Sequence, residues 1–506
     1  MKSTSRRACV AATLVAALAM SALPSLAQAA PEPTIPQITK DRISGTDRYA
    51  TAIAVSQQYT SPVPVLFVAT GTDFPDALSA AAAAAKLGGP LLLTPKAEVP
   101  EAVLAEAKRL QPESIIVVGG TNVVSEAVET TLAEIAPTKR WGGADRYATG
   151  LNIVESAFET STSAIIATGF AFPDALAASS AAATNDAPVI LVNGRADQVT
   201  PETLETLTKL GVKSVTIAGG KNAVSAGIET QLAAQFKLQR IGGVDRYATA
   251  AALNDAFFPA GTTATAFLAT GLNFPDALSG AALAGAVGAP LYVTPTACLP
   301  DVVRASQTKL GVTRRIALGG TTVVSDDAAK ALGCLMASVP SISGKVVSGQ
   351  ILTASTGTWT TGATLTYSWL ADGTPIASAT ASKLTLTTAL VGKKISVVVT
   401  GSLAGYATVS KTSAATVAVT QPAPTTSATP KPATPAPTTS ATPKPSTPTQ
   451  ASPNGWDCPA WAPIKGNASS MIYHVPGGAS YAKTNPEICF TTTAAAEAAG
   501  YRAAKR

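Results

Sequence analysis

The histidine content of this 506-residue chain limits the chemistry available to it. His474, close to the C-terminus, is the only histidine. Zinc hydrolases usually hold their metal with two or three histidines, and serine hydrolases need one beside the nucleophile. The sequence also contains no His-Glu-x-x-His, Gly-x-Ser-x-Gly or phosphate-loop pattern. We therefore expect no catalytic residue, no metal and no cofactor.

Six arginines at repeated positions are the strongest candidates for binding. They form three pairs: Arg42 and Arg48, Arg140 and Arg146, Arg240 and Arg246. A guanidinium group binds a phosphate or carboxylate with two parallel hydrogen bonds, so each pair could clamp an anionic ligand. Alternatively, each arginine could pair with the neighbouring Asp47, Asp145 or Asp245 and hold the repeats together. The sequence leaves both interpretations open.

The elements that must position these arginines lie in a segment that occurs three times between residues 40 and 338. Each copy opens with Arg-x-x-Gly-x-Asp-Arg-Tyr-Ala-Thr, starting at Arg42, Arg140 and Arg240, and continues with Phe-Pro-Asp-Ala-Leu and a Gly-Gly pair. A period near 100 residues is the size of a small domain and too long for a solenoid repeat.

Within one copy, continuous apolar runs alternate with helical patterns. The first copy predicts strands at 65–69, 91–93 and 114–118, and helices at 76–87, 101–110 and 125–135. Apolar strands that are each followed by a helix indicate a parallel sheet covered on both faces. We therefore expect an α/β protein with three tandem Rossmann-like or flavodoxin-like repeats.

An aspartate follows the proline of each Phe-Pro-Asp-Ala-Leu block, at Asp76, Asp174 and Asp276. These positions fall in the first turn of a predicted helix, where a carboxylate stabilises the helix dipole. We expect this structural role for them rather than ligand or metal binding.

The repeated blocks, together with a proline-aliphatic strand and a Gly-Gly-x-x-x-Val-Ser turn, resemble the type-2 cell-wall-binding repeat. That resemblance implies three units packed around a rough threefold axis, which would be a monomer with internal pseudo-threefold symmetry. It also implies non-covalent attachment to an anionic cell-wall polysaccharide or to peptidoglycan of Gram-positive bacteria.

The family's polymer-binding motif is a proline followed by aliphatic residues on a strand. By position, the resemblance assigns polymer binding to Pro90, Leu91, Leu92, Leu93, Pro188, Val189, Ile190, Leu191, Pro290 and Leu291. In the third copy the motif continues with Tyr292 and Val293 and so departs from the usual form.

The net charge of +6 is unevenly distributed. Residues 40–338 carry −4, whereas residues 339–506 carry +8. The basic part has no clustered arginines and no interleaved aromatic residues, which argues against specific nucleic-acid binding. A mildly acidic repeat region also argues against a broad electrostatic attraction to a polyanion.

The N-terminus has the pattern of a secretory signal. Basic residues precede an apolar run from Ala8 to Ala22, and Ala27-Gln28-Ala29 is a typical cleavage site. We expect a secreted protein at the cell wall or cell surface, with no membrane span after signal removal. Export favours disulfides. The four cysteines that follow the predicted signal peptide can pair in three ways. We expect Cys298–Cys334 and Cys458–Cys489, because the two members of each pair are close in sequence.

The C-terminal third has a different composition. Alternating strands around Trp369 predict an all-β sandwich of about seven strands that resembles bacterial immunoglobulin-like surface repeats. A Pro/Thr/Ser-rich linker, expected to be disordered, leads to a small module similar to one that closes many actinobacterial secreted proteins. The expected segments are a signal peptide 1–29, a short linker 30–39, repeats 40–138, 139–237 and 238–338, the sandwich 340–420, the linker 421–453 and the C-terminal module 454–506.

These features favour a secreted, non-catalytic protein that binds the cell wall through its repeats and displays its C-terminal modules. Two alternatives remain open. One is a cell-wall hydrolase of the amidase type, since this repeat often accompanies amidases. The other is a surface adhesin whose working part is the sandwich or the C-terminal module.

Overall fold

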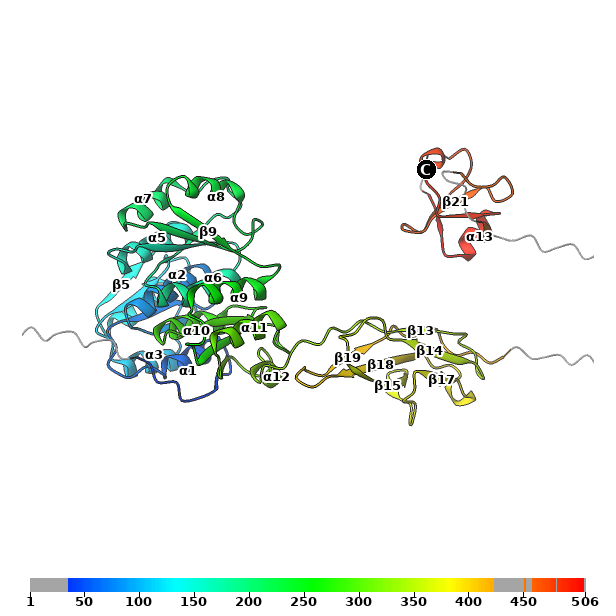
Figure 1. Cartoon of the computed structure of the whole chain (residues 1–506), viewed down its shortest axis with the longest axis horizontal. Helices are drawn as coiled ribbons and strands as arrows, with labels where there is room; N and C mark the ends of the chain where they lie inside the picture. The colour runs from blue at the N-terminus through cyan, green and yellow to red at the C-terminus, as the bar shows by residue number, and fades with distance from the viewer. Residues whose placement is uncertain (1–34, 423–449, 452–456, 479, 505–506) are drawn as a thin grey trace, which may run out of the picture. The chain divides into compact units, whose positions relative to one another are not determined.

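The computed structural model describes residues 35–422, 450–451, 457–478 and 480–504 (Figure 1). The predicted signal peptide and most of the predicted Pro/Thr/Ser-rich linker lie outside these residues. The chain divides into a unit that ends at Ala423 and a C-terminal unit that starts at Pro424.

The repeat region contains three parallel sheets of four strands each. The first has the order β3 (Leu91–Thr94), β2 (Leu66–Thr70), β4 (Ile115–Val118), β5 (Thr138–Trp141). The second has the order β7 (Val189–Val192), β6 (Ser163–Thr168), β8 (Ser214–Ala218), β9 (Lys237–Ile241). The third has the order β11 (Leu291–Thr294), β10 (Thr265–Thr270), β12 (Arg314–Leu318), β1 (Arg42–Ile43).

The N-terminal strand closes the ring of repeats. In the third sheet β1 pairs with β12, so that Arg42 lies opposite Ala317 and Ile43 opposite Leu318. In the other two sheets the equivalent strands, β5 and β9, come directly after the repeat whose sheet they complete. The third repeat therefore depends on residues almost 300 positions earlier in the chain.

Twelve helices accompany these strands in the described repeat region: α1 (Arg48–Ser56), α2 (Pro75–Lys86), α3 (Glu101–Leu110), α4 (Glu126–Ala133), α5 (Arg146–Ala157), α6 (Pro173–Thr184), α7 (Pro201–Lys209), α8 (Ala226–Ala233), α9 (Arg246–Phe257), α10 (Pro275–Ala286), α11 (Asp301–Leu310) and α12 (Asp326–Ala329). The predicted helix 101–110 is observed with the same bounds. Ser125 caps α4 as its sequence position suggests, since its hydroxyl accepts a hydrogen bond from the backbone N–H of Val128.

Three alanine-rich helices, α2, α6 and α10, pack on one another at the centre of the repeat region (Figure 1). Small side chains make this close packing feasible. A β-carbon at Gly285 would lie 2.6 Å from that of Ala183 and 3.0 Å from that of Ala85. These are equivalent positions of the three helices, so they meet around one axis. The structure confirms the predicted α/β class and its pseudo-threefold packing.

Residues 340–420 form two antiparallel sheets around one apolar core. The strands are β13 (Ser341–Ser343), β14 (Ile351–Ser355), β15 (Thr364–Ala371), β16 (Thr374–Pro375), β17 (Lys383–Thr385), β18 (Ile395–Ser402) and β19 (Val409–Thr412), with a 3₁₀ turn, η1 (Thr388–Leu390). Trp369 is fully buried between the sheets, and its indole N–H donates to the carbonyl of Ala381 at 2.9 Å. The predicted all-β architecture of this segment is present.

In its described residues, the C-terminal unit has a small five-stranded sheet, one short α-helix and a disulfide between Cys458 and Cys489. Its elements are β20 (Gln450–Ala451), β21 (Ile464–Asn467), β22 (Ile472–His474), η2 (Tyr481–Lys483), β23 (Ile488–Phe490), α13 (Thr493–Ala498) and β24 (Arg502–Ala503). His474 lies on β22. Over the described residues, every helix is too short or too polar to span a membrane.

Candidate binding site

Three pockets of the same construction lie where one repeat meets the next. Their volumes are about 140 Å³ between the first and second repeats, about 340 Å³ between the second and third, and about 220 Å³ between the third and the N-terminal segment. We call them the 1–2, 2–3 and 3–1 pockets. The 1–2 pocket lies beyond the carboxyl ends of β2 and β4, where the order of strands reverses and where open α/β sheets commonly bind ligands.

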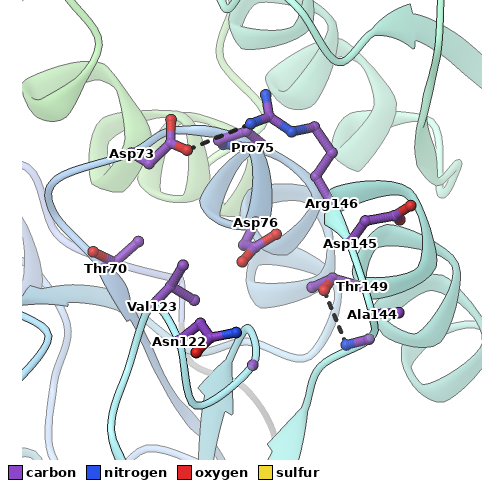
Figure 2. A pocket seen from close by; sticks show the side chains of 12 residues that line it. Thr70, Asp73, Pro75, Asp76, Asn122, Val123, Ala144, Asp145, Arg146 and Thr149 are labelled. Carbon is purple, nitrogen blue, oxygen red and sulfur yellow. Dashed lines mark hydrogen bonds and ion pairs between the residues drawn. The ribbon is translucent and has the colours of Figure 1, made fainter.

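An aspartate that is buried (Asp76) or partly buried (Asp174 and Asp276) lies in the middle of each pocket. In the 1–2 pocket Asp76 is only 9% exposed. Figure 2 shows its carboxyl group between Asn122 and Val123 on one side and Thr149 on the other. Asp174 and Asp276 take the same place in the 2–3 and 3–1 pockets.

Burial raises the pKa of these carboxyl groups. The pKa of Asp76 rises to about 6, mainly because of its burial and also because of the negative charge of Asp73. Burial also raises the pKa of Asp174 to about 6, against the opposing effect of Arg246. The pKa of Asp276 is raised for the same reason, although a hydrogen bond from Thr51 and the charge of Arg48 lower it. Near pH 6 the carboxyl groups of Asp76 and Asp174 can therefore either donate or accept a hydrogen bond.

The glycine pairs of the sequence leave room for these carboxyl groups. Gly119 has a φ of +99°, and a β-carbon there would lie 2.5 Å from Oδ2 of Asp76. Gly219 and Gly319 also have positive φ angles and approach Asp174 and Asp276 in the same way. The recurring Gly-Gly turn is therefore the wall of a pocket that only glycine permits.

The first arginine of each pair holds this turn in place. Arg140 donates from Nη1 to the carbonyl of Gly119 at 2.8 Å and forms a 2.7 Å ion pair with Glu129. Arg240 makes the same contacts with Gly219 and Glu229, and Arg42 makes them with Gly319 and Asp326. These three side chains are mostly buried, so they position the pocket wall.

The second arginine of each pair lines the pocket itself. Arg146 donates from Nη1 to the carbonyl of Gly169 at 2.8 Å, and its Nη2 lies 3.6 Å from Oδ2 of Asp73 (Figure 2). Arg48 and Arg246 make the equivalent bond to the carbonyls of Gly71 and Gly271. A hydrogen bond to one backbone carbonyl thus fixes each guanidinium at the rim of its pocket.

The aspartates next to these arginines are not their partners. Asp145 caps α5, because its Oδ1 accepts the backbone N–H groups of Tyr147 at 2.9 Å and Ala148 at 2.8 Å. Asp47 and Asp245 cap α1 and α9 in the same way. The suggested pairing of each arginine with its neighbouring aspartate is therefore absent, although the first arginines do hold the structure together through other acids.

A phenylalanine cluster lies between the three pockets on the pseudo-threefold axis. The rings of Phe74, Phe172 and Phe274 are 5.5–5.9 Å apart, at angles that bring ring edges toward ring faces. The guanidinium of Arg146 lies 5.9 Å from the ring of Phe74, and that of Arg246 lies 5.9 Å from the ring of Phe172. Each Phe-Pro-Asp-Ala-Leu block thus supplies both the central cluster and one pocket carboxyl.

The proline-aliphatic strands lie inside the protein. Every side chain of this set is buried: Pro90, Leu91, Leu92, Leu93, Pro188, Val189, Ile190, Leu191, Pro290 and Leu291. They form β3, β7 and β11 and the residue before each strand. In this structure they support the sheets that carry the pocket loops.

The sequence did not predict that the three aspartates of the Phe-Pro-Asp-Ala-Leu blocks line pockets. Their place in the first helical turn suggested a dipole role, and Asp76 is indeed in the first turn of α2. Yet its carboxyl group makes no hydrogen bond within the described residues, and Phe74 at the N-cap makes no side-chain cap either. The available signal was that the aspartate recurs in all three copies beside a Gly-Gly pair that recurs with it.

Both expected disulfides are present, Cys298–Cys334 and Cys458–Cys489. Within the described residues, no three histidine, cysteine, aspartate or glutamate side chains cluster so that they could hold a metal ion.

Comparison with known proteins gives matches over the repeat region. The curated relatives include the N-acetylmuramoyl-L-alanine amidase LytC of Bacillus subtilis, 28% identical over 292 residues, which are 58% of this chain and 57% of LytC. They also include the Amidase enhancer of Bacillus subtilis, 31% identical over 48% of this chain and 33% of that protein. The chain thus matches only part of these relatives.

Two solved structures from Clostridium difficile have the same fold. Cwp6 is 25% identical, with a TM-score of 0.53, over 59% of this chain and 48% of its own. Cwp8 is 25% identical, with a TM-score of 0.52, over 56% of this chain and 50% of its own. Near the C-terminus, residues 433–503 match a family described as ArfC.

The three repeats match one family separately and in register, at residues 42–129, 140–229 and 240–329. Together these segments make up more than half of the sequence. The chain therefore belongs to the family described as Cell wall binding domain 2 (CWB2).

Proposed function

We propose that this protein is a secreted, non-catalytic cell-wall-binding protein, which attaches to a wall polymer through its repeats and displays the β-sandwich and C-terminal module. The observation that carries the proposal is the threefold recurrence of one pocket in a chain of the CWB2 family. Three sites that each bind weakly can together hold a repetitive polymer firmly, because later contacts are intramolecular.

The pocket residues suit the recognition of a polymer that carries hydroxyl and acidic groups. A carboxyl group and a threonine hydroxyl or asparagine amide bind sugar hydroxyls, while a guanidinium donates hydrogen bonds to hydroxyl, phosphate or carboxylate oxygens. We assign direct contact to Arg48, Arg146 and Arg246 and to the three pocket aspartates. Arg42, Arg140, Arg240 and the three proline-aliphatic strands are assigned supporting roles.

The absence of catalysis is part of the proposal. Each pocket combines aspartate, arginine and threonine, and none contains a cysteine or a histidine. The alternative function is that of a wall hydrolase, and the similarity to the amidase LytC is the observation that favours it. The 292 aligned residues are about the length of the three repeats together, which favours a shared binding region rather than a shared active site.

The test is sedimentation of the purified protein with purified Gram-positive cell walls, before and after hydrofluoric acid removes phosphodiester-linked polymers. We expect the protein to sediment with intact walls and to remain in solution with stripped walls. The triple variant D76N/D174N/D276N should lose most of this binding. Release of soluble wall fragments would instead support the hydrolase.

A matched control alters three exposed carboxylates outside the pockets, in the variant E101Q/E134Q/E159Q. It removes the same number of negative charges and should sediment like the unaltered protein. Equal binding by both triple variants would show that the pockets are not the site, and failure to bind any wall preparation would contradict the proposed function itself.

A further inference from the structure

The three pockets have the same framework but different charges. The 1–2 pocket is lined by three carboxyl groups, from Asp73, Asp76 and Asp145, against one guanidinium, from Arg146. The 3–1 pocket has two carboxyl groups, from Asp47 and Asp276, against Arg48.

The 2–3 pocket has a balanced charge. Its two carboxyl groups, from Asp174 and Asp245, face two cations, Arg246 and Lys221. Lys221 follows the Gly-Gly pair, where the other copies have Thr121 and Thr321. The 2–3 pocket therefore gains a cation that the equivalent positions of the other copies do not supply.

The residue at position 73 of the first repeat, and at the equivalent position 171 of the second, decides whether the second arginine of the pair already has an acidic partner in its pocket. In the 1–2 pocket Asp73 lies 3.6 Å from Arg146 and so competes with any anionic ligand. The equivalent residue of the 2–3 pocket is Ala171, which is exposed and carries no charge. Neither Arg246 nor Lys221 forms a salt bridge with another described residue.

The 2–3 pocket also has the space for a ligand group. Its volume of about 340 Å³ exceeds the volume of about 140 Å³ in the 1–2 pocket. The bond from Nη1 of Arg246 to the carbonyl of Gly271 orients the guanidinium without using its Nη2. A fixed guanidinium and a lysine that line the same pocket are a suitable receptor for a phosphate or carboxylate.

From these differences we infer that the 2–3 pocket is the anion subsite of the repeat region, which takes a phosphate or carboxylate group of the wall polymer. The 1–2 pocket, with its surplus of carboxyl groups, repels such a group. This inference rests on the proposed function, and it predicts that the acidic group of the polymer has one preferred place among three similar pockets.

Two reciprocal substitutions test it in the full-length protein. A171D gives the 2–3 pocket the acid of the 1–2 pocket, and D73A removes that acid from the 1–2 pocket. We expect A171D and K221A to weaken sedimentation with intact walls several-fold at low salt, with a smaller effect at high salt because the lost contact is electrostatic. D73A should not weaken binding. K213A, which removes an exposed lysine outside the pockets, should bind like the unaltered protein.

Wall binding that is unaffected by both A171D and K221A would overturn the inference, as would D73A weakening binding as much as A171D does. If the unaltered protein binds no walls, the proposed function has failed and the pocket is tested separately with inorganic phosphate. Thermal unfolding is then measured in phosphate and in chloride of equal ionic strength. A stabilisation by phosphate that A171D removes would support an anion pocket that binds free anions, and equal melting temperatures in both salts would exclude it.

Discussion

Asp76 and Gly119 are in contact at the wall of the 1–2 pocket, at a distance that a residue with a side chain at position 119 does not permit. The hypothetical β-carbon of residue 119 lies 2.5 Å from Oδ2 of Asp76, and φ at this position is +99°. Two features that recur separately in the sequence, the Gly-Gly pair and the Phe-Pro-Asp block, are therefore two parts of one structure.

The first prediction concerns this contact. G119A should lower the free energy of unfolding by roughly 2–4 kcal/mol, because it adds both backbone strain and overlap with the carboxyl group. The matched control is G211A, where φ is +77° but nothing lies within 4 Å of the added carbon. G211A should lower the free energy of unfolding only by the backbone strain, which is about 1–2 kcal/mol. Urea denaturation of the two variants measures the difference.

The part of the overlap that involves Asp76 can be separated by adding D76A to each variant, although Cγ2 of Val123 also lies 2.6 Å from the hypothetical β-carbon. If Asp76 causes the overlap, D76A should recover part of the loss in G119A and none of the loss in G211A. Equal effects of the two glycine substitutions would contradict the assigned role of Asp76.

The second prediction concerns pH. Because burial raises the pKa of Asp76 to about 6 from an ordinary value of 3.8, the folded protein holds this proton more tightly than the unfolded chain. The contribution of Asp76 to stability is fully present below about pH 4 and is lost as pH rises through about 6. D76N keeps a neutral group at every pH. Relative to the unaltered protein, it should therefore gain about 2 kcal/mol between pH 4 and pH 7.5.

Thermal or urea unfolding at the two pH values gives this relative gain. D174N should show the same trend, since the pKa of Asp174 is also raised to about 6. A pH-independent difference between D76N and the unaltered protein would show that this carboxyl group is charged as readily in the pocket as in water.

The third prediction follows from the closure of the ring by β1. The backbone N–H groups of Ala317 and Gly319 bond to the carbonyls of Asp41 and Ile43, both at 2.8 Å. R42A removes the hydrogen bonds and ion pair that hold the N-terminal segment to the third repeat. We expect faster amide hydrogen exchange at Ala317 and Gly319, nearly 300 residues away in sequence, with little change in the first sheet.

The matched variant is R140A, which breaks the equivalent contacts within the first sheet. Exchange should then increase at Gly119, whose N–H bonds to the carbonyl of Trp141, and not at Gly319. Exchange that rises in the first sheet of R42A, rather than in the third, would contradict the observed pairing.

The fourth prediction concerns the disulfide Cys298–Cys334. The helix before Cys334 is α12, with four residues, whereas its counterparts α4 and α8 have eight. The disulfide closes a segment of 36 residues. It fixes the chain after α12, at the place where this helix is shorter than its counterparts. C298S/C334S should lose about 3–4 kcal/mol in the chain-entropy description. Calorimetry of this variant and of C458S/C489S, whose loss should be confined to the C-terminal unit, would test the assignment.

The sequence by itself determined the class of the fold and its threefold repetition. Apolar runs such as 91–93 are buried strands because continuous hydrophobic side chains need cover on both faces of a parallel sheet. Helix 101–110 and the cap at Ser125 are equally local, since helical periodicity and capping depend on neighbouring residues. The two disulfides, which the structure contains, could be proposed from the spacing of the cysteines together with the expected export of the chain.

The tertiary structure alone decided what the recurring polar residues do. Helix α1 and strand β5 were not expected, because the Arg-Tyr-Ala-Thr block and Thr138–Trp141 show no clear apolar period and are set in place by their neighbours in the sheets. Arg42 and Arg48 are six residues apart and look interchangeable, yet one supports the turn of a distant repeat and the other lines a pocket. Asp76 lies in a pocket because residues from separate parts of the chain, among them Gly119 and Thr149, come together around it. Local sequence patterns determine which helices and strands form, whereas a pocket depends on which helices and strands from distant parts of the sequence pack together.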